Sequence, residues 1–149
     1  MFFFHGWPGS RLDFGPNDAA AVAAGVRVIA VDRPGIGGSD PQRGRTVLDW
    51  PADVAALADA LRLDQFAVFG FSFGGPFARA CAYALPERVT RAGLVSCLAP
   101  VDDPSVKRGM PAATRYGLSA ARLSPLLARP MVWFTARQAR AGQMIQHGL

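Results

Sequence analysis

The chain has 149 residues, of which half are apolar and 18% charged, so it is of ordinary single-domain size and is not intrinsically disordered. No run approaches the roughly 20 apolar residues of a membrane span. Residues 1–5 also lack the basic start and long apolar stretch of a secretory signal. We therefore expect a cytoplasmic protein with no membrane partner.

The net charge of +5 is unevenly placed along the chain. All 11 acidic residues lie within residues 1–103, whereas residues 104–149 carry basic residues and no acid. These basic residues are mostly six to eight positions apart, which is typical of solvated helix faces rather than a dense patch. No interleaved aromatic residues or nucleic-acid-binding module accompany them, so we expect no nucleic-acid partner.

Apolar runs at 2–5, 26–31, 66–70 and 91–97 predict strands, with helical stretches between them. Helices are predicted near 17–24, from 50 to about 61, and from the glycine-rich turn to about 84. In the second of these, Asp49 is the expected cap, and Trp50, Val54, Leu57 and Leu61 form one apolar stripe. This alternation predicts an α/β fold, a parallel sheet with crossover helices.

Residues 70–75 read GFSFGG and contain the pattern G-x-S-x-G. An apolar run precedes them and an alanine-rich helical stretch follows, which is the context this motif needs. A serine on such a tight strand-to-helix turn projects its hydroxyl from the carboxyl end of the sheet, and the flanking glycines let helix and strand pack closely. Ser72 is therefore the candidate nucleophile. The alternative is a glycine-rich turn with an incidental serine.

Two more turns follow predicted strands: residues 5–10 read HGWPGS, and residues 32–40 read DRPGIGGSD. With the G-x-S-x-G turn, in this order and spacing, they make residues 1–103 resemble the α/β-hydrolase fold family. The resemblance implies a hydrolase of esters or related acyl bonds, with carboxylesterase favoured over proline-iminopeptidase-like amide hydrolysis. Serine at the elbow disfavours the haloalkane dehalogenase and epoxide hydrolase branches, which use aspartate there.

The resemblance also assigns roles to residues around Ser72. The backbone N–H groups of Phe73 and Trp7 would form the oxyanion hole. His5 would brace the first turn and not act as the base, although a buried packing histidine is an equal alternative. The expected partner is a small-molecule acyl substrate, with no cofactor and no metal.

The turn after residue 31 has a rival interpretation as a dinucleotide site, because glycines follow Asp32. The dinucleotide fingerprint needs G-x-G-x-x-G opening a helix, whereas Asp40 stands at the third glycine position and Pro34 and Pro41 frame a loop. We expect instead that Asp32 and Arg33 hold this loop beside the elbow by hydrogen bonds.

The acid and base of the family's triad are not identified by the sequence. Chain order allows Asp102 or Asp103 as the acid and His147, the one histidine after Ser72, as the base. Its sequence surroundings favour a surface helix for His147 over a place above the sheet. Without a base the chain is expected to be a very poor catalyst.

Compared with the family, the chain resembles a partial copy. Residues 1–100 would form a partial core of about four of the eight strands, and residues 101–149 the start of a helical cap. Within 101–149 we expect short helices and one strand-like run at 131–135. Missing strands would leave two bare sheet edges, which favour self-association. The alternative to a hydrolase is a non-catalytic, hydrolase-like fragment or pseudoenzyme.

Overall fold

The computed structural model describes residues 1–98, 103–124, 126, 129–130, 133–134 and 137. The chain divides into two compact units, Met1–Leu98 and Ala99–Leu149. The division falls close to the predicted boundary at residue 100. The assignment of the second unit to a cap stays a prediction.

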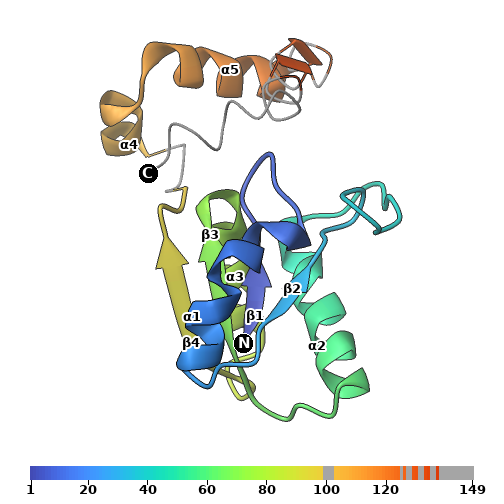
Figure 1. The fold of residues 1–149 in the computed structure, drawn as a ribbon. Coiled ribbons are helices and arrows are strands. Elements are labelled where there is room, and N and C mark those ends of the chain that lie inside the picture. The colour runs from blue at the N-terminus through green and yellow to red at the C-terminus, as the bar shows by residue number, and fades with distance from the viewer. Residues whose placement is uncertain (99–102, 125, 127–128, 131–132, 135–136, 138–149) are drawn as a thin grey trace. The chain divides into compact units, whose positions relative to one another are not determined.

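The first unit is built on a parallel sheet, as predicted (Figure 1). Its strands are β1 (Phe2–Phe4), β2 (Ile29–Val31), β3 (Phe66–Phe71) and β4 (Val89–Val95), in the order β2-β1-β3-β4. The chain first adds β2 on one side of β1 and then adds β3 on the other side of β1. The winding thus reverses between β1 and β3, and in open parallel sheets ligands bind at the carboxyl ends of the strands at this reversal.

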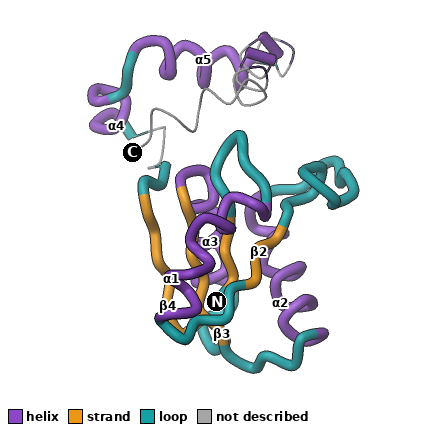
Figure 2. The backbone as a smooth tube through the Cα atoms, viewed as in Figure 1, coloured by secondary structure: helices purple, strands orange, loops and turns teal. Residues whose placement is uncertain are grey.

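Helices connect the strands in alternation (Figure 2). The helix α1 (Asp18–Ala23) follows a 3-10 turn, η1 (Arg11–Asn17), and lies on one face of the sheet. The helices α2 (Trp50–Ala60) and α3 (Gly75–Ala84) contact each other and cover the opposite face. The connection into α2 ends in η2 (Val47–Asp49), and η3 (Ser72–Gly74) joins β3 to α3.

Aromatic side chains fill both faces of the sheet at β1. Phe2 and Phe4 are fully buried on the side of α2, with edge contacts to Phe66 and Trp50 respectively. Phe3 faces the other way and contacts Phe14 of η1. Burying one such side chain contributes about 1.5–3 kcal/mol, so three consecutive phenylalanines fix β1 in the centre of the sheet.

Three local predictions are wrong in detail. The second strand begins at Ile29 and not at residue 26, and the fourth spans Val89–Val95 and not 91–97. The Asp49 side chain does not cap α2, because its carboxylate accepts hydrogen bonds from the Thr46 amide and hydroxyl. Asp49 thereby closes the capping box of the preceding 3-10 turn.

The second unit contains α4 (Pro104–Gly109) and α5 (Ala112–Leu123). The predicted strand-like run at 131–135 is not a strand at its described positions, because Trp133 and Phe134 are helical. None of the helices that the structure describes is both long enough and apolar enough to cross a bilayer.

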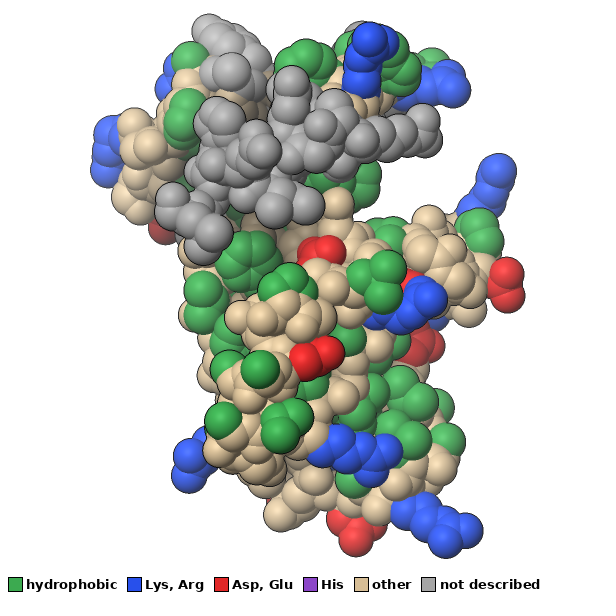
Figure 3. Space-filling model, viewed as in Figure 1, with side chains coloured by type: hydrophobic (Ala, Val, Ile, Leu, Met, Phe, Trp, Pro, Cys, Tyr) green, Lys and Arg blue, Asp and Glu red, His purple; other side chains and the backbone are tan. Residues whose placement is uncertain are grey.

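The outer strands carry open edges. Among the described residues β2 pairs with β1 and β4 with β3, each on one side. Large apolar side chains such as Leu94 and Val95 of β4 are exposed. On the viewed face of the first unit, hydrophobic side chains lie between separate acidic and basic ones (Figure 3). The self-association predicted from such edges stays a prediction.

Candidate active site

Ser72 stands at the junction of β3 and η3 with its backbone in the left-handed region, at a φ of 51°. This conformation is uncommon for a residue with a side chain and costs about 1–3 kcal/mol, which the surrounding structure must offset. Strain of this kind marks the sharp strand-to-helix turn predicted for the G-x-S-x-G motif.

The glycines of the turn are required by close approaches of other atoms, of backbone at Gly70 and Gly74 and of a side chain at Gly75. A Cβ on Gly74 would lie 1.9 Å from the carbonyl oxygen of Phe4, and one on Gly70 would lie 2.6 Å from the oxygen of Gly74. A Cβ on Gly75 would lie 2.2 Å from Sγ of Cys97. The prediction that these glycines serve close packing of helix and strand is confirmed.

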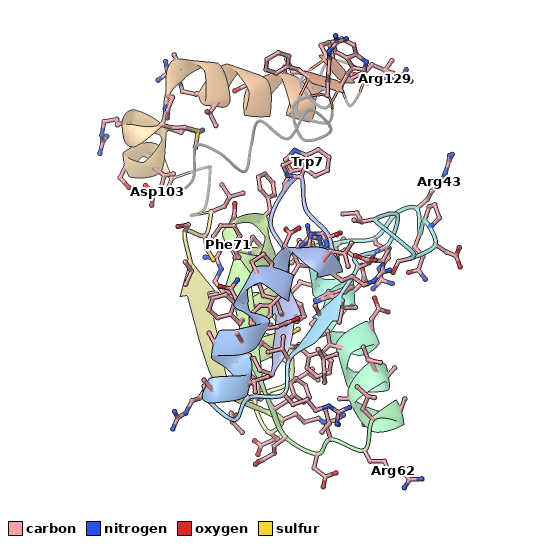
Figure 4. The ribbon with its side chains drawn as sticks, in the orientation of Figure 1. Trp7, Arg43, Arg62, Phe71, Asp103 and Arg129 are labelled. Carbon is pink, nitrogen blue, oxygen red and sulfur yellow. The ribbon has the colours of Figure 1, made fainter. Side chains whose placement is uncertain are left out.

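The turn after β1 lies directly against this elbow. A Cβ on Gly6 would be 3.2 Å from Cβ of Ser72 and 3.2 Å from the Phe71 ring. Trp7 and Phe71 are found at the same end of the first unit, with Arg62 at the opposite end (Figure 4). The structure therefore brings Ser72, Phe73 and the Trp7 turn together at the sheet's winding reversal.

Asp32 holds the loop after β2, as the sequence predicts. Its carboxylate accepts hydrogen bonds from the Arg11 amide and guanidinium and from the Gly38 amide. Burial acts to raise the pKa of Asp32, but these hydrogen bonds outweigh it and hold the pKa below its ordinary value. All three donors stabilise the charged carboxylate, so Asp32 has a structural role.

His5 is fully buried and its Nδ1 lies 2.9 Å from the carbonyl oxygen of Gly6. Its Nε2 has no hydrogen-bond partner in the described part of the chain. The pKa of His5 lies below its ordinary 6.5, because burial and then the neighbouring Arg33 cation disfavour the protonated ring. A neutral ring that contacts the first turn agrees with a bracing residue rather than a base.

This shift predicts a loss of stability in mild acid. Because the unfolded chain protonates His5 more readily than the folded one, stability is complete above pH 6.5 and falls as the pH drops below it. We expect chemical denaturation to give a lower free energy of unfolding at about pH 5 than at about pH 7.5. His5→Asn should remove this dependence. An equally steep dependence in the variant would contradict the assignment.

Of the candidate acids and base, the structure describes Asp103, which has hydrogen-bond partners within the second unit. The carboxylate of Asp103 accepts hydrogen bonds from the Ser105 amide and hydroxyl and so caps α4, which lowers the pKa of Asp103. Asp102 and His147 lie outside the described residues. Within the described part of the chain, no side chain hydrogen-bonds the hydroxyl of Ser72.

A hollow of about 370 Å³ lies away from the elbow, between β2, α2 and the loop after β2. Asp32, Asp40 and Asp53 line it together with apolar residues of α2, and Ser72 is not among its lining residues. We place the candidate site at the elbow and not in this hollow. Strained residues cluster at functional sites, and ligands of open parallel sheets bind at the winding reversal, where Ser72 lies.

A family model described as the alpha/beta hydrolase fold matches residues 1–144. The chain belongs to this family. It is 46% identical over 103 residues to a non-heme chloroperoxidase of Streptomyces lividans, an alignment that covers 68% of this chain and 37% of that protein. It is 38% identical over 110 residues to a 2-hydroxymuconate semialdehyde hydrolase of a Pseudomonas species, covering 71% and 38%.

Solved structures agree with this membership. An esterase from Exiguobacterium antarcticum superposes with a TM-score of 0.57 and 28% identity over 66% of this chain and 38% of that one. The chain thus spans well under half the length of these hydrolase-family relatives. The fold and the family predicted from the three motifs are confirmed.

Sequence reasoning missed one residue of this site. It assigned Arg33 to the loop beside the elbow, but the Arg33 side chain reaches the turn after β1 and donates to the carbonyl oxygens of His5 and Gly6. No local sequence signal reveals this contact, because it depends on the pairing of β1 with β2, in which Phe4 stands opposite Val31.

Proposed function

We propose that this hydrolase-family chain carries the nucleophilic half of a serine hydrolase, which cleaves ester or related acyl bonds through an acyl-serine on Ser72. The observation that carries the proposal is the left-handed backbone of Ser72 at the carboxyl end of β3, against the turn after β1. At this position the strained turn exposes the hydroxyl of a nucleophile beside the turn that would supply an oxyanion donor.

In the proposed reaction the Oγ of Ser72 bonds to the carbonyl carbon of the substrate while its proton passes to a base. The tetrahedral intermediate expels the alcohol, which takes up that proton, and leaves an acyl-serine. Water then attacks the same carbon, and the carboxylic acid leaves as Ser72 regains its proton. The candidates for the acid are Asp102 and Asp103, and the candidate for the base is His147.

The oxyanion of each tetrahedral intermediate needs preorganised donors. We propose the amides of Phe73 and Trp7, one in η3 directly after Ser72 and the other directly after Gly6. A donor of this kind contributes about 3–4 kcal/mol to the transition state. The exposed rings of Phe71 and Phe73, the chain neighbours of Ser72, and of Trp7 in the adjacent turn support an apolar acyl group as substrate.

The test is intact-mass analysis of the purified chain after exposure to a fluorophosphonate, followed by digestion to locate the adduct. We expect one adduct, on the peptide that contains Ser72. Ser96 is a built-in comparison, because it also follows a strand with a left-handed backbone, at a φ of 50°. An adduct on Ser96 or at scattered serines would contradict the proposed site.

One observation favours the second candidate, a hydrolase-like module without turnover. The Ser72 hydroxyl has no hydrogen-bond partner among the described side chains, so the described residues supply no base. A chain that is folded by circular dichroism and takes no label would support this alternative and overturn the acyl-serine proposal.

A further inference from the structure

Arg33 is nearly buried, with 7% of its surface exposed, although it carries a charge. It follows β2 directly, and β2 pairs with β1 so that Val31 stands opposite Phe4. Its guanidinium therefore reaches the residues after β1, where Nη1 donates to the carbonyl oxygen of His5 at 2.5 Å and Nη2 to that of Gly6 at 3.1 Å. A buried charge is retained when hydrogen bonds of this kind compensate its desolvation.

The Gly6 carbonyl belongs to the same rigid unit as the Trp7 amide. The peptide group is planar, and in the trans form its C=O and N–H point in opposite directions. A donor that fixes the Gly6 oxygen therefore also fixes the direction of the Trp7 N–H. Gly6 has no side chain to restrict its backbone, so the plane of this peptide depends on outside contacts.

The same guanidinium contacts the helix that follows Ser72. It stacks over the ring of Phe77 in α3, with 4.8 Å from its central carbon to the ring centroid. Phe77 in turn makes an edge contact with the buried Trp50 of α2, at 5.8 Å between centroids. Arg33 is thus held on one side by the core and contacts the turn after β1 on the other.

We propose that Arg33 is a positioning residue that orients the Trp7 amide toward the oxyanion formed at Ser72. The proposal rests on the proposed function, since it concerns one of the two suggested oxyanion donors. Arg33 does not itself touch the reacting atoms. It acts through the Gly6–Trp7 peptide, and its positive charge beside that peptide further favours a developing negative charge.

The charge of Arg33 persists at neutral pH. Burial lowers the pKa of Arg33 to about 10, which still leaves the guanidinium protonated in the physiological range. The geometry therefore holds across the pH range in which a serine hydrolase works.

The chain offers a matched control in Arg88. It also donates to two successive carbonyl oxygens, those of Leu63 and Asp64, and lies over an aromatic ring, that of Phe66. It precedes β4, at the amino end of the strands, whereas the elbow lies at the carboxyl end. Loss of Arg88 thus removes two comparable bonds to carbonyl oxygens, together with an ion pair to Asp59, without touching the first turn.

The experiment compares Arg33→Met, Arg33→Lys and Arg88→Met in the full chain. The first readout is a spectrum of protein labelled with ¹⁵N on tryptophan alone, which reports the backbone amides of 3 residues. The second is the rate of inactivation by the fluorophosphonate. We expect Arg33→Met to shift the Trp7 amide signal and to slow labelling at least tenfold, in line with loss of one oxyanion donor. Arg88→Met should leave both unchanged.

If Arg33→Met does not fold, Arg33→Lys tests whether Arg33 orients the Trp7 amide. A lysine keeps the positive charge but carries its three N–H donors on one nitrogen and lacks the planar guanidinium fork, so the Trp7 amide should still shift while labelling is partly restored. An unshifted Trp7 amide in the Arg33 variants, or slowing equal to that of Arg88→Met, would overturn the proposal. If the unmodified chain takes no label, the proposed function fails, and the Trp7 signal alone still decides whether Arg33 orients this amide.

Discussion

Alanine at position 72 is expected to abolish fluorophosphonate labelling and to reduce ester hydrolysis on the order of a millionfold in any form of the protein that turns over. The Oγ of Ser72 is the atom that bonds to the substrate in the proposed mechanism. Without it, no acyl-serine forms, and only the amides of Phe73 and Trp7 stabilise the transition state. The measurement is intact mass for the label and p-nitrophenyl ester cleavage for turnover. The fold should survive, because the hydroxyl makes no hydrogen bond to the described residues.

Ser96→Ala is the matched control for this variant. Ser96 is exposed, lies after the neighbouring strand β4 and shares the left-handed backbone, at a φ of 50°. It should take the label at the unmodified rate. Retention of labelling or of esterase activity in Ser72→Ala would show that another residue carries the chemistry.

Alanine at position 74 is expected to have the largest effect on stability, a loss of about 3 kcal/mol or more in the free energy of unfolding. The added Cβ would lie 1.9 Å from the carbonyl oxygen of Phe4 and 3.0 Å from that of His5. Phe4 is the last residue of the buried strand β1 and His5 follows it, so both oxygens are backbone atoms. Removing the steric overlap therefore requires β1 to move away from β3. Labelling at Ser72 should fall as well, because that movement displaces the Trp7 turn.

Gly15→Ala provides the comparison for this prediction. Gly15 lies in η1, and a Cβ there meets nothing within 4 Å. Its free energy of unfolding should stay within about 0.5–1 kcal/mol of the unmodified chain. Both variants are measured by chemical denaturation. A Gly74→Ala chain as stable as Gly15→Ala would show that the elbow is not packed against β1 as described.

The sheet was predictable because each strand is followed by a turn whose residues are dictated by backbone geometry. The glycines around Ser72 are an example, since contacts of 1.9–2.6 Å leave no room for side chains at positions 70, 74 and 75. Strand limits were less predictable. The apolar run from residue 26 does not pair as β2 until Ile29, and pairing depends on the partner strand rather than on local hydrophobicity.

The site was predictable only where one local segment carries the chemistry. Ser72 and its turn lie in six consecutive residues, whereas the role of Arg33 depends on which strands are neighbours. The acid and base stay predictions, because Asp103 caps a helix of the second unit and Asp102 and His147 fall outside the described residues. The position of an acid and a base beside a serine depends on tertiary contacts that no local pattern encodes.

The central position of β1 sets the order in which this chain can fold. Its three phenylalanines are synthesised well before their partner strand, since Phe2 pairs with Val68 and Phe4 with Gly70. Contacts between such distant segments close large loops and slow folding, and apolar segments that wait for a partner promote aggregation. The first strand is therefore the segment for which a chaperone would compete during synthesis, until β3 has emerged to cover it.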